Sequence, residues 1–206
     1  ARRHLPGIDP LYTQRDAARA MRRFKTIEYD HVRELFPGIK VRLQDAGHIL
    51  GSAIVEFILE EDGQRHKLVF SGDLGLKDAP ILRDITPVRE ADSIIMESTY
   101  GDRLHRSFDD TLEEMAELFS EARADQGNVL IPAFAVGRTQ ELLYLFGRYF
   151  DEWGIGNWQI FLDSPLAIDA TAVYMQHSDL FDEESLTLWQ QHKSISDLPK
   201  IGRAHV

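Results

Sequence analysis

Residues 45–57 read DAGHILGSAIVEF, in which a histidine lies between two glycines and a run of alternating apolar and small residues follows. The alternation from residue 53 predicts a buried strand, and the glycines predict a turn that holds His48 at the start of it. A histidine in a turn is more often a hydrogen-bonded structural residue than a metal ligand. This stretch therefore predicts the local fold and leaves the role of His48 open.

Strand-like segments dominate the rest of the first hundred residues. Asp62-Gly63 lies between two of them and is a strong hairpin signal. A basic segment, 13–24, precedes them and is typical of a helix whose arginines face either solvent or phosphate. The predicted strands are 41–44, 53–59, 67–71 and 93–97. The first half is thus expected to be a β-rich layer with helices against it.

The pattern changes after residue 100, where apolar residues recur at helical spacing. Ser107, followed three residues later by Asp110, is typical of a capping box at the start of a helix that ends near residue 126. Further helices are predicted over 138–150 and 166–177, and strands over 128–133 and 158–162. Alternating strands and helices imply βαβ crossovers and a parallel sheet, so we expect an α/β chain with a boundary near residue 100.

The composition is that of a globular chain with unevenly distributed charge. Hydrophobic residues make up 43% of the 206, which is enough for a sizeable core. The net charge is −11, and residues 99–206 carry −10 of it. Such an acidic surface argues against broad capture of nucleic acid, although a local basic groove or bound cations would outweigh it. No apolar stretch is long enough to span a bilayer and the sequence begins without a secretion signal, so we expect a cytoplasmic protein.

Three of the predicted strands have an ionisable residue at or just past their end: His48, Asp73 and Glu97. Because the chain has no cysteine, any transition metal would be held by histidine and carboxylate, which are ligands that suit zinc. Each residue alone has a simpler explanation. His48 would be a structural histidine, Asp73 would belong to a turn-forming Gly-Asp pair, and Glu97 would cap the following loop.

Four segments in this order, DAGHILGSA, SGDLG, ESTYGDRLH and PAFAVGRTQELL, resemble the β-CASP branch of the metallo-β-lactamase superfamily. The resemblance extends from about residue 11 to residue 180. It implies a partial metallo-β-lactamase αββα sandwich over residues 1–100, followed by a partial β-CASP domain of βαβ type with a parallel sheet over residues 101–200. It also implies a zinc-dependent ribonuclease that hydrolyses phosphodiester bonds in RNA processing.

The resemblance also implies roles for the three strand-end residues. His48 matches a zinc ligand, and Asp73 matches a catalytic carboxylate that bridges two zinc ions, between which the family activates its hydrolytic water. Glu97 matches a catalytic acidic residue that orients a histidine acting as general acid. That histidine has no match in this chain.

Three further residues match positions where substrate contact is plausible: His105, Arg138 and Ser164. Arg138 has a fixed charge at a helix start, where an anion is favoured. Each has an alternative role. His105 would pair with a neighbouring acid, Arg138 with Glu141, and Ser164 would cap the helix that follows it.

The chain departs from the family pattern in its metal motifs. The HxHxDH motif occurs nowhere in residues 1–206, and His177, His192 and His205 do not lie in matching contexts. Two zinc ions need about three protein ligands each, and only His48 and Asp73 match zinc-ligand positions of the family. We therefore expect a middle fragment of a longer zinc enzyme, inactive by itself, with residues 201–206 (IGRAHV) as a non-native tail.

Two alternatives to a ribonuclease stay open: a non-catalytic β-CASP-type partner subunit, and a metallo-hydrolase of a small ester or thioester. Retention of His48, Asp73 and Glu97 favours an enzyme, and a second domain covering the site suits a polymeric substrate. RNA is the expected partner. DNA as substrate, endo- versus 5′-exonuclease cleavage and a homodimer are left open, and no membrane partner is expected.

Overall fold

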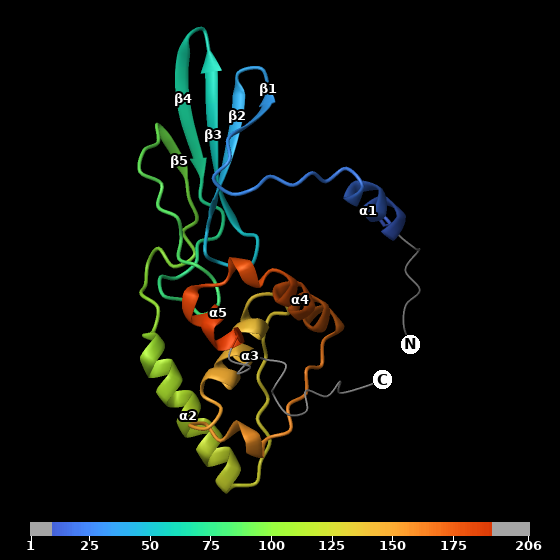
Figure 1. Cartoon of the computed structure of the whole chain (residues 1–206), viewed down its shortest axis with the longest axis vertical. Coiled ribbons are helices and arrows are strands. Elements are labelled where there is room, and N and C mark those ends of the chain that lie inside the picture. Colours follow the sequence, from blue (N-terminus) through green and yellow to red (C-terminus); the bar gives the residue numbers. More distant parts are fainter. Residues whose placement is uncertain (1–9, 191–206) are drawn as a thin grey trace, which may run out of the picture.

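The computed structural model describes residues 10–190, and its first half is built around one five-stranded sheet (Figure 1). Strands β1 to β4 run antiparallel to their neighbours, while β5 is parallel to β4. The strands are β1 (Arg33–Phe36), β2 (Ile39–Asp45), β3 (Ala53–Glu61), β4 (Gln64–Phe70) and β5 (Ser93–Ile95). The four predicted strands are confirmed, whereas β1 was not predicted.

Strand β3 has one buried side, as the alternation in its sequence predicts. Ile54, Glu56 and Ile58 are buried, and the residues between them are partly exposed. Glu56 accepts a hydrogen bond from Arg42 of β2, and its Oε1 lies 2.7 Å from Nζ of Lys67 on β4. This charge triad links the three central strands and compensates the buried carboxylate.

The turns and edges of the sheet follow local backbone rules. Asp62 and Gly63 both have positive φ, 50° and 75°, as a two-residue type I′ hairpin requires, which confirms the hairpin between β3 and β4. At the outer edge the register of β1 on β2 shifts between Glu34 and Phe36, which is a β-bulge. Strand β1 is exposed along its whole length.

The second half is helical and surrounds an aromatic core. Phe119 packs against Phe146, Trp153 and Trp158 with ring centroids 5.7 to 5.8 Å apart. The longer helices are α2 (Phe108–Ala124), α3 (Arg138–Arg148), α4 (Pro165–Gln176) and α5 (Glu183–Gln190). The predictions for α2, α3 and α4 are confirmed, and α5 was not predicted.

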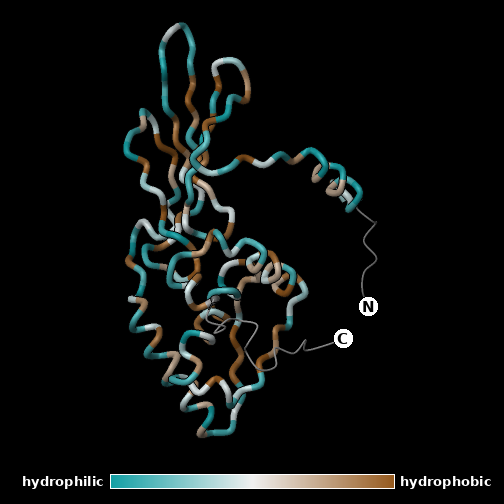
Figure 2. The backbone as a smooth tube through the Cα atoms, in the orientation of Figure 1, coloured by the Kyte–Doolittle hydropathy of each residue, from teal (hydrophilic) through white to brown (hydrophobic). Residues whose placement is uncertain are grey.

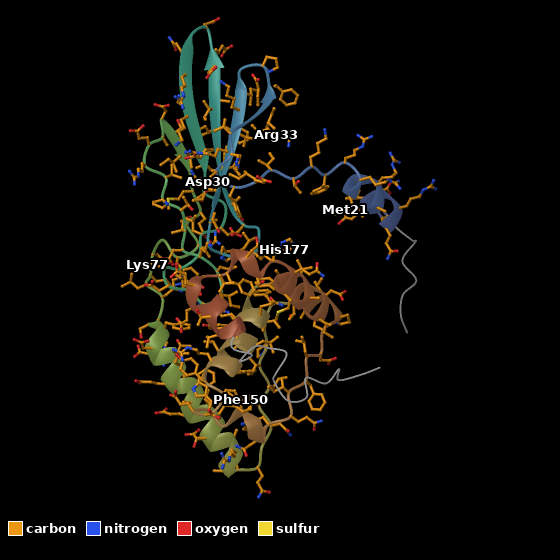
Figure 3. The ribbon with its side chains drawn as sticks, viewed as in Figure 1. Met21, Asp30, Arg33, Lys77, Phe150 and His177 are labelled. Atoms are coloured by element: carbon orange, nitrogen blue, oxygen red, sulfur yellow. The ribbon has the colours of Figure 1, made fainter. Side chains whose placement is uncertain are left out.

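The basic segment near the start forms helix α1 (Gln14–Met21), as predicted. It has no buried residue and stands apart from both halves, as the position of Met21 in Figure 3 shows. Its arginines therefore lie in solvent, and phosphate contact by this helix stays the open alternative. Within the described part of the chain, no helix combines the length and apolarity needed to cross a bilayer.

The predicted strands of the second half are not formed in residues 10–190. Segment 128–133 has no ladder partner in the described residues and is largely hydrophobic (Figure 2). It is nevertheless exposed, with Leu130 at 92%. In segment 158–162, Trp158, Ile160 and Leu162 pack against the aromatic core without forming a strand. The α/β class is confirmed, but β4–β5 is the only parallel pair of strands in the described residues, beside an isolated parallel bridge between Tyr29 and Leu43. Apolar residues in a segment indicate that it can be buried, but a β-strand forms only where a second strand lies beside it to complete the hydrogen-bonded ladder.

The two halves meet through the turn that follows β2. The backbone N–H of Leu50 in this turn donates to the Tyr174 hydroxyl of α4 at 3.1 Å. Beside it, Tyr174 packs with Ile81 and Phe181, and Leu82 forms a backbone bridge to Phe181. The turn that carries His48 therefore lies at the junction of the sheet and the helices.

Candidate active site

The His48 turn, residues 46–52, is closed by Ser52. Ser52 Oγ accepts hydrogen bonds from the N–H groups of His48 at 3.1 Å and Ile49 at 3.3 Å, and the Ser52 N–H donates to the Ile49 carbonyl at 2.9 Å. Gly47 has φ of +62°, a conformation that favours glycine. These bonds fix the backbone of the turn and leave the His48 side chain exposed.

Two partly buried side chains support the His48 turn from the sheet side. The Tyr29 hydroxyl donates to the Ser52 carbonyl at 2.8 Å, and burial, aided by the charge of Asp45, raises the pKa of Tyr29 to about 12. The Gly47 N–H donates to Asp45 Oδ1 at 2.9 Å. Burial raises the pKa of Asp45 although this hydrogen bond opposes the shift. Because its own pKa is raised, the Tyr29 hydroxyl remains a neutral hydrogen-bond donor at physiological pH.

The Asp73 turn, residues 71–75, lies directly against the His48 turn. The Gly75 N–H donates to the Ala46 carbonyl at 2.8 Å. A Cβ at position 75 would lie 1.8 Å from the Gly47 carbonyl oxygen and 2.8 Å from the His48 nitrogen, so the two backbones approach as closely as glycine allows. His48 and Asp73 are both exposed. The structure therefore brings together the turns that carry the two predicted zinc ligands.

Glu97 joins the Asp73 turn to the loop that follows β5. Its Oε1 accepts the Leu74 N–H at 2.6 Å, and its Oε2 accepts the Thr99 hydroxyl at 2.7 Å. The hydrogen bonds from Leu74 and Thr99 lower the pKa of Glu97, and the electrostatic influence of the nearby His48 adds a smaller effect in the same direction. An ionised carboxylate thus lies beside both turns.

His48 and Asp73 have the donor atoms that zinc prefers, an imidazole nitrogen and carboxylate oxygens. Within residues 10–190, no group of three or more His, Cys, Asp or Glu side chains lies close enough together to hold a metal ion. A zinc site needs three or four protein donors. The described residues therefore provide part of a donor set, and ligation by His48 and Asp73 stays a prediction.

Arg138 lies at the start of α3, next to the His48 turn. A Cβ at Gly137 would lie 2.7 Å from Ile49 Cγ2, so this helix start packs on the turn. Arg138 Nη1 is 2.6 Å from Glu141 Oε2, which is the alternative that the sequence left open. Burial raises the pKa of Glu141, and the charge of Arg138 opposes that shift. Phosphate contact by Arg138 stays a prediction.

The other two predicted substrate contacts lie in different settings. Ser164 Oγ accepts the Ala167 N–H at 3.2 Å and caps α4, the alternative foreseen for it. His105 lies in the loop after Glu97, where its ring contacts that of Tyr100 in a tilted arrangement with centroids 3.9 Å apart. Contact of either residue with substrate stays a prediction.

Sequence reasoning missed the residues that hold this arrangement in place. Ser52 had a signal, because a serine four residues after His48 in a glycine turn can close that turn. Ser71 had none, although its hydroxyl accepts the Glu97 N–H at 3.1 Å. Tyr174 had none either, because it lies 124 residues from its partner Leu50.

Comparison with known sequences identifies the family of the chain. The family model of the Beta-Casp domain matches residues 139–201, of which the structure describes α3 to α5. A ribonuclease of Thermus thermophilus is 33% identical over 186 residues, which are 90% of this chain and 42% of the relative. The chain belongs to the β-CASP branch of the metallo-β-lactamase superfamily.

Other relatives extend the comparison within the β-CASP branch. An RNase J-like protein of Methanocaldococcus jannaschii is 37% identical over 175 residues, covering 83% of this chain and 40% of the relative. The transcription termination factor FttA of Thermococcus kodakarensis is 30% identical over 179 residues, covering 85% of this chain and 27% of the relative. The chain thus spans less than half the length of these β-CASP relatives.

Proposed function

We propose that the complete protein is a zinc-dependent ribonuclease located in the cytoplasm. The observation that carries the proposal is the contact between the His48 and Asp73 turns, with Glu97 hydrogen-bonded to Leu74 at 2.6 Å. Three ionisable groups, an imidazole and two carboxylates, thereby share one junction between the halves. The names of the ribonuclease and RNase J-like relatives support RNA as the substrate.

Each of the three residues has a separate task in this proposal. His48 and Asp73 would hold zinc, which when bound supplies Lewis-acid chemistry that makes hydroxide available near neutral pH. Asp73 has two oxygens and exposed surroundings, so it can serve two cations. Glu97, whose pKa is lowered, would accept a hydrogen bond from a histidine that protonates the leaving oxygen.

The test is made on the complete protein, with zinc content and cleavage of labelled RNA and DNA measured side by side. His48→Ala and Asp73→Ala should each lose bound zinc and cut RNA at least about 100-fold more slowly, because they remove a proposed ligand. His31→Ala and Asp169→Ala remove an exposed histidine and an exposed aspartate elsewhere and should retain both properties. Full turnover in both site variants would overturn the proposal.

A further inference from the structure

The loop that follows Glu97 gathers planar side chains on the surface. The Tyr100 and His105 ring centroids are 3.9 Å apart with the planes at 45°, and the Arg103 guanidinium carbon lies 5.1 Å from the Tyr100 centroid. We call Tyr100, Arg103 and His105 the Tyr100 stack. Tyr100 is 49% exposed, and the other two members are exposed as well.

Backbone turns build the Tyr100 stack. The Gly101 N–H donates to the Ser98 carbonyl at 3.0 Å, and the Arg103 N–H approaches the Tyr100 carbonyl at 3.4 Å. Residues 98–101 and 100–103 therefore form two overlapping turns, and Arg103 lies against the ring of Tyr100. The stack is consequently a product of local loop geometry.

Packing within the fold does not account for the Tyr100 stack. None of its members belongs to a hydrophobic cluster of residues 10–190, and over the same range Arg103 has no ion pair and His105 no side-chain hydrogen bond. By contrast, the nearby Arg106 is paired with Glu114. An exposed aromatic group of this kind, flanked by a cation, is typical of a ligand-binding surface.

We propose that the Tyr100 stack binds an unpaired nucleobase of single-stranded RNA, an inference that rests on the proposed function. Every base has a π face, so stacking on aromatic and guanidinium groups is effective for any sequence. The loop also contains Asp102, which offsets the charge of Arg103. Stacking on a base therefore explains this surface better than capture of a phosphate does.

The position of the Tyr100 stack connects it to the candidate active site. Glu97 lies three residues before Tyr100, and its carboxylate is hydrogen-bonded to Leu74 next to Asp73. A base held by Tyr100 would anchor the RNA strand beside the His48 and Asp73 turns. A base inside a duplex has no free π face, so the stack selects single-stranded substrate.

The proposal is tested by RNA binding with the full chain, in the presence of a chelator so that the RNA stays intact. A single-stranded oligonucleotide that carries the fluorescent base 2-aminopurine is compared with an oligonucleotide of the same length that contains abasic sites. Tyr100→Leu should weaken binding of the base-containing RNA by about fivefold or more and reduce the fluorescence change, because the aromatic surface is lost. Tyr100→Phe keeps the ring and should bind within about twofold of the parent.

Two matched controls accompany these variants. Tyr12→Leu removes another exposed tyrosine and should leave binding unchanged. Binding of the abasic RNA should be the same in the parent and Tyr100→Leu proteins. The proposal is overturned if Tyr100→Leu weakens both RNAs equally, if it weakens neither, or if the parent binds no RNA.

Cleavage by the complete protein separates this inference from the proposed function. Base-dependent binding without cleavage would support the Tyr100 stack and contradict the ribonuclease. Cleavage with unchanged KM in Tyr100→Leu would support the ribonuclease and contradict the stack.

Discussion

Glu56 keeps a carboxylate in the centre of the sheet with 0% of its surface exposed. The neighbouring cations Arg42 and Lys67 make this possible, because an unpaired charge at the same place would lose its hydration without compensation. The sequence pattern of β3 marks position 56 as facing the buried side, yet it does not show that partners from two other strands converge there.

Replacing Glu56 by glutamine should lower the free energy of unfolding by about 3 kcal/mol, because two cations lose their common counter-ion. Glu60→Gln on the same strand is the matched control. Its pair with Lys40 is partly exposed, with side-chain exposures of 47% and 35%, so the loss should stay below about 1 kcal/mol. Urea denaturation of both variants measures the difference, and equal losses would contradict this account.

The same residue makes stability depend on pH. Burial alone would raise the pKa of Glu56, but hydrogen bonds from Arg42 and Lys67 outweigh it and place the pKa below the ordinary 4.5. The stabilisation is therefore present above pH 4.5 and is lost as the pH falls through the folded-state pKa. Unfolding measured from pH 6 down to about pH 3 should show a smaller decline in Glu56→Gln than in the parent. Parallel curves would exclude Glu56 as the source.

At the scale of elements, the decisive feature is the contact between two turns. The His48 turn and the Asp73 turn touch through backbone atoms at Gly75, where a Cβ would lie 1.8 Å from the Gly47 carbonyl oxygen. No side-chain rotation can relieve a clash between a Cβ and a backbone oxygen, so any larger residue must separate the turns.

Gly75→Ala should therefore destabilise the protein by about 2 kcal/mol and shift the NMR signals of His48. Gly127→Ala is the control, because its nearest neighbour would be the Ala122 carbonyl oxygen at 3.6 Å, an ordinary contact. Thermal unfolding and a two-dimensional NMR spectrum of each variant provide the comparison. Unchanged His48 signals in Gly75→Ala would mean that the turns are not coupled.

At the scale of the whole molecule, one hydrogen bond between the halves stands out. Tyr174 is 4% exposed, and its hydroxyl accepts the Leu50 N–H of the His48 turn. Removal of this acceptor leaves a backbone donor without a partner in a partly buried place.

Tyr174→Phe should accordingly cost about 1–2 kcal/mol and accelerate hydrogen exchange at the Leu50 amide. Tyr149→Phe removes a hydroxyl that has no hydrogen bond in residues 10–190, and it should alter neither property. Exchange rates measured amide by amide distinguish a local effect from general loosening. An unchanged Leu50 rate in Tyr174→Phe would show that this hydrogen bond does not protect the His48 turn.

The sequence predictions were accurate where the interacting residues are close to each other in the sequence. Hairpin Asp62-Gly63 and the Ser107 cap rest on residues within four positions of each other, and both are confirmed. Segment 128–133 has the composition of a strand, but a strand also needs a partner that composition does not supply. The closeness of the His48 and Asp73 turns was expected from the family resemblance, whereas the Tyr174 contact depends on packing between the halves.

The bulge between Glu34 and Phe36 has a consequence for how copies of this protein behave at high concentration. Within residues 10–190, strand β1 has no partner on its outer side, and such edges recruit further strands from other molecules. The shifted register interrupts the row of regularly spaced donors and acceptors that an incoming chain would need. Growth into fibrils from this side is thereby discouraged by backbone shape, with no covering element required.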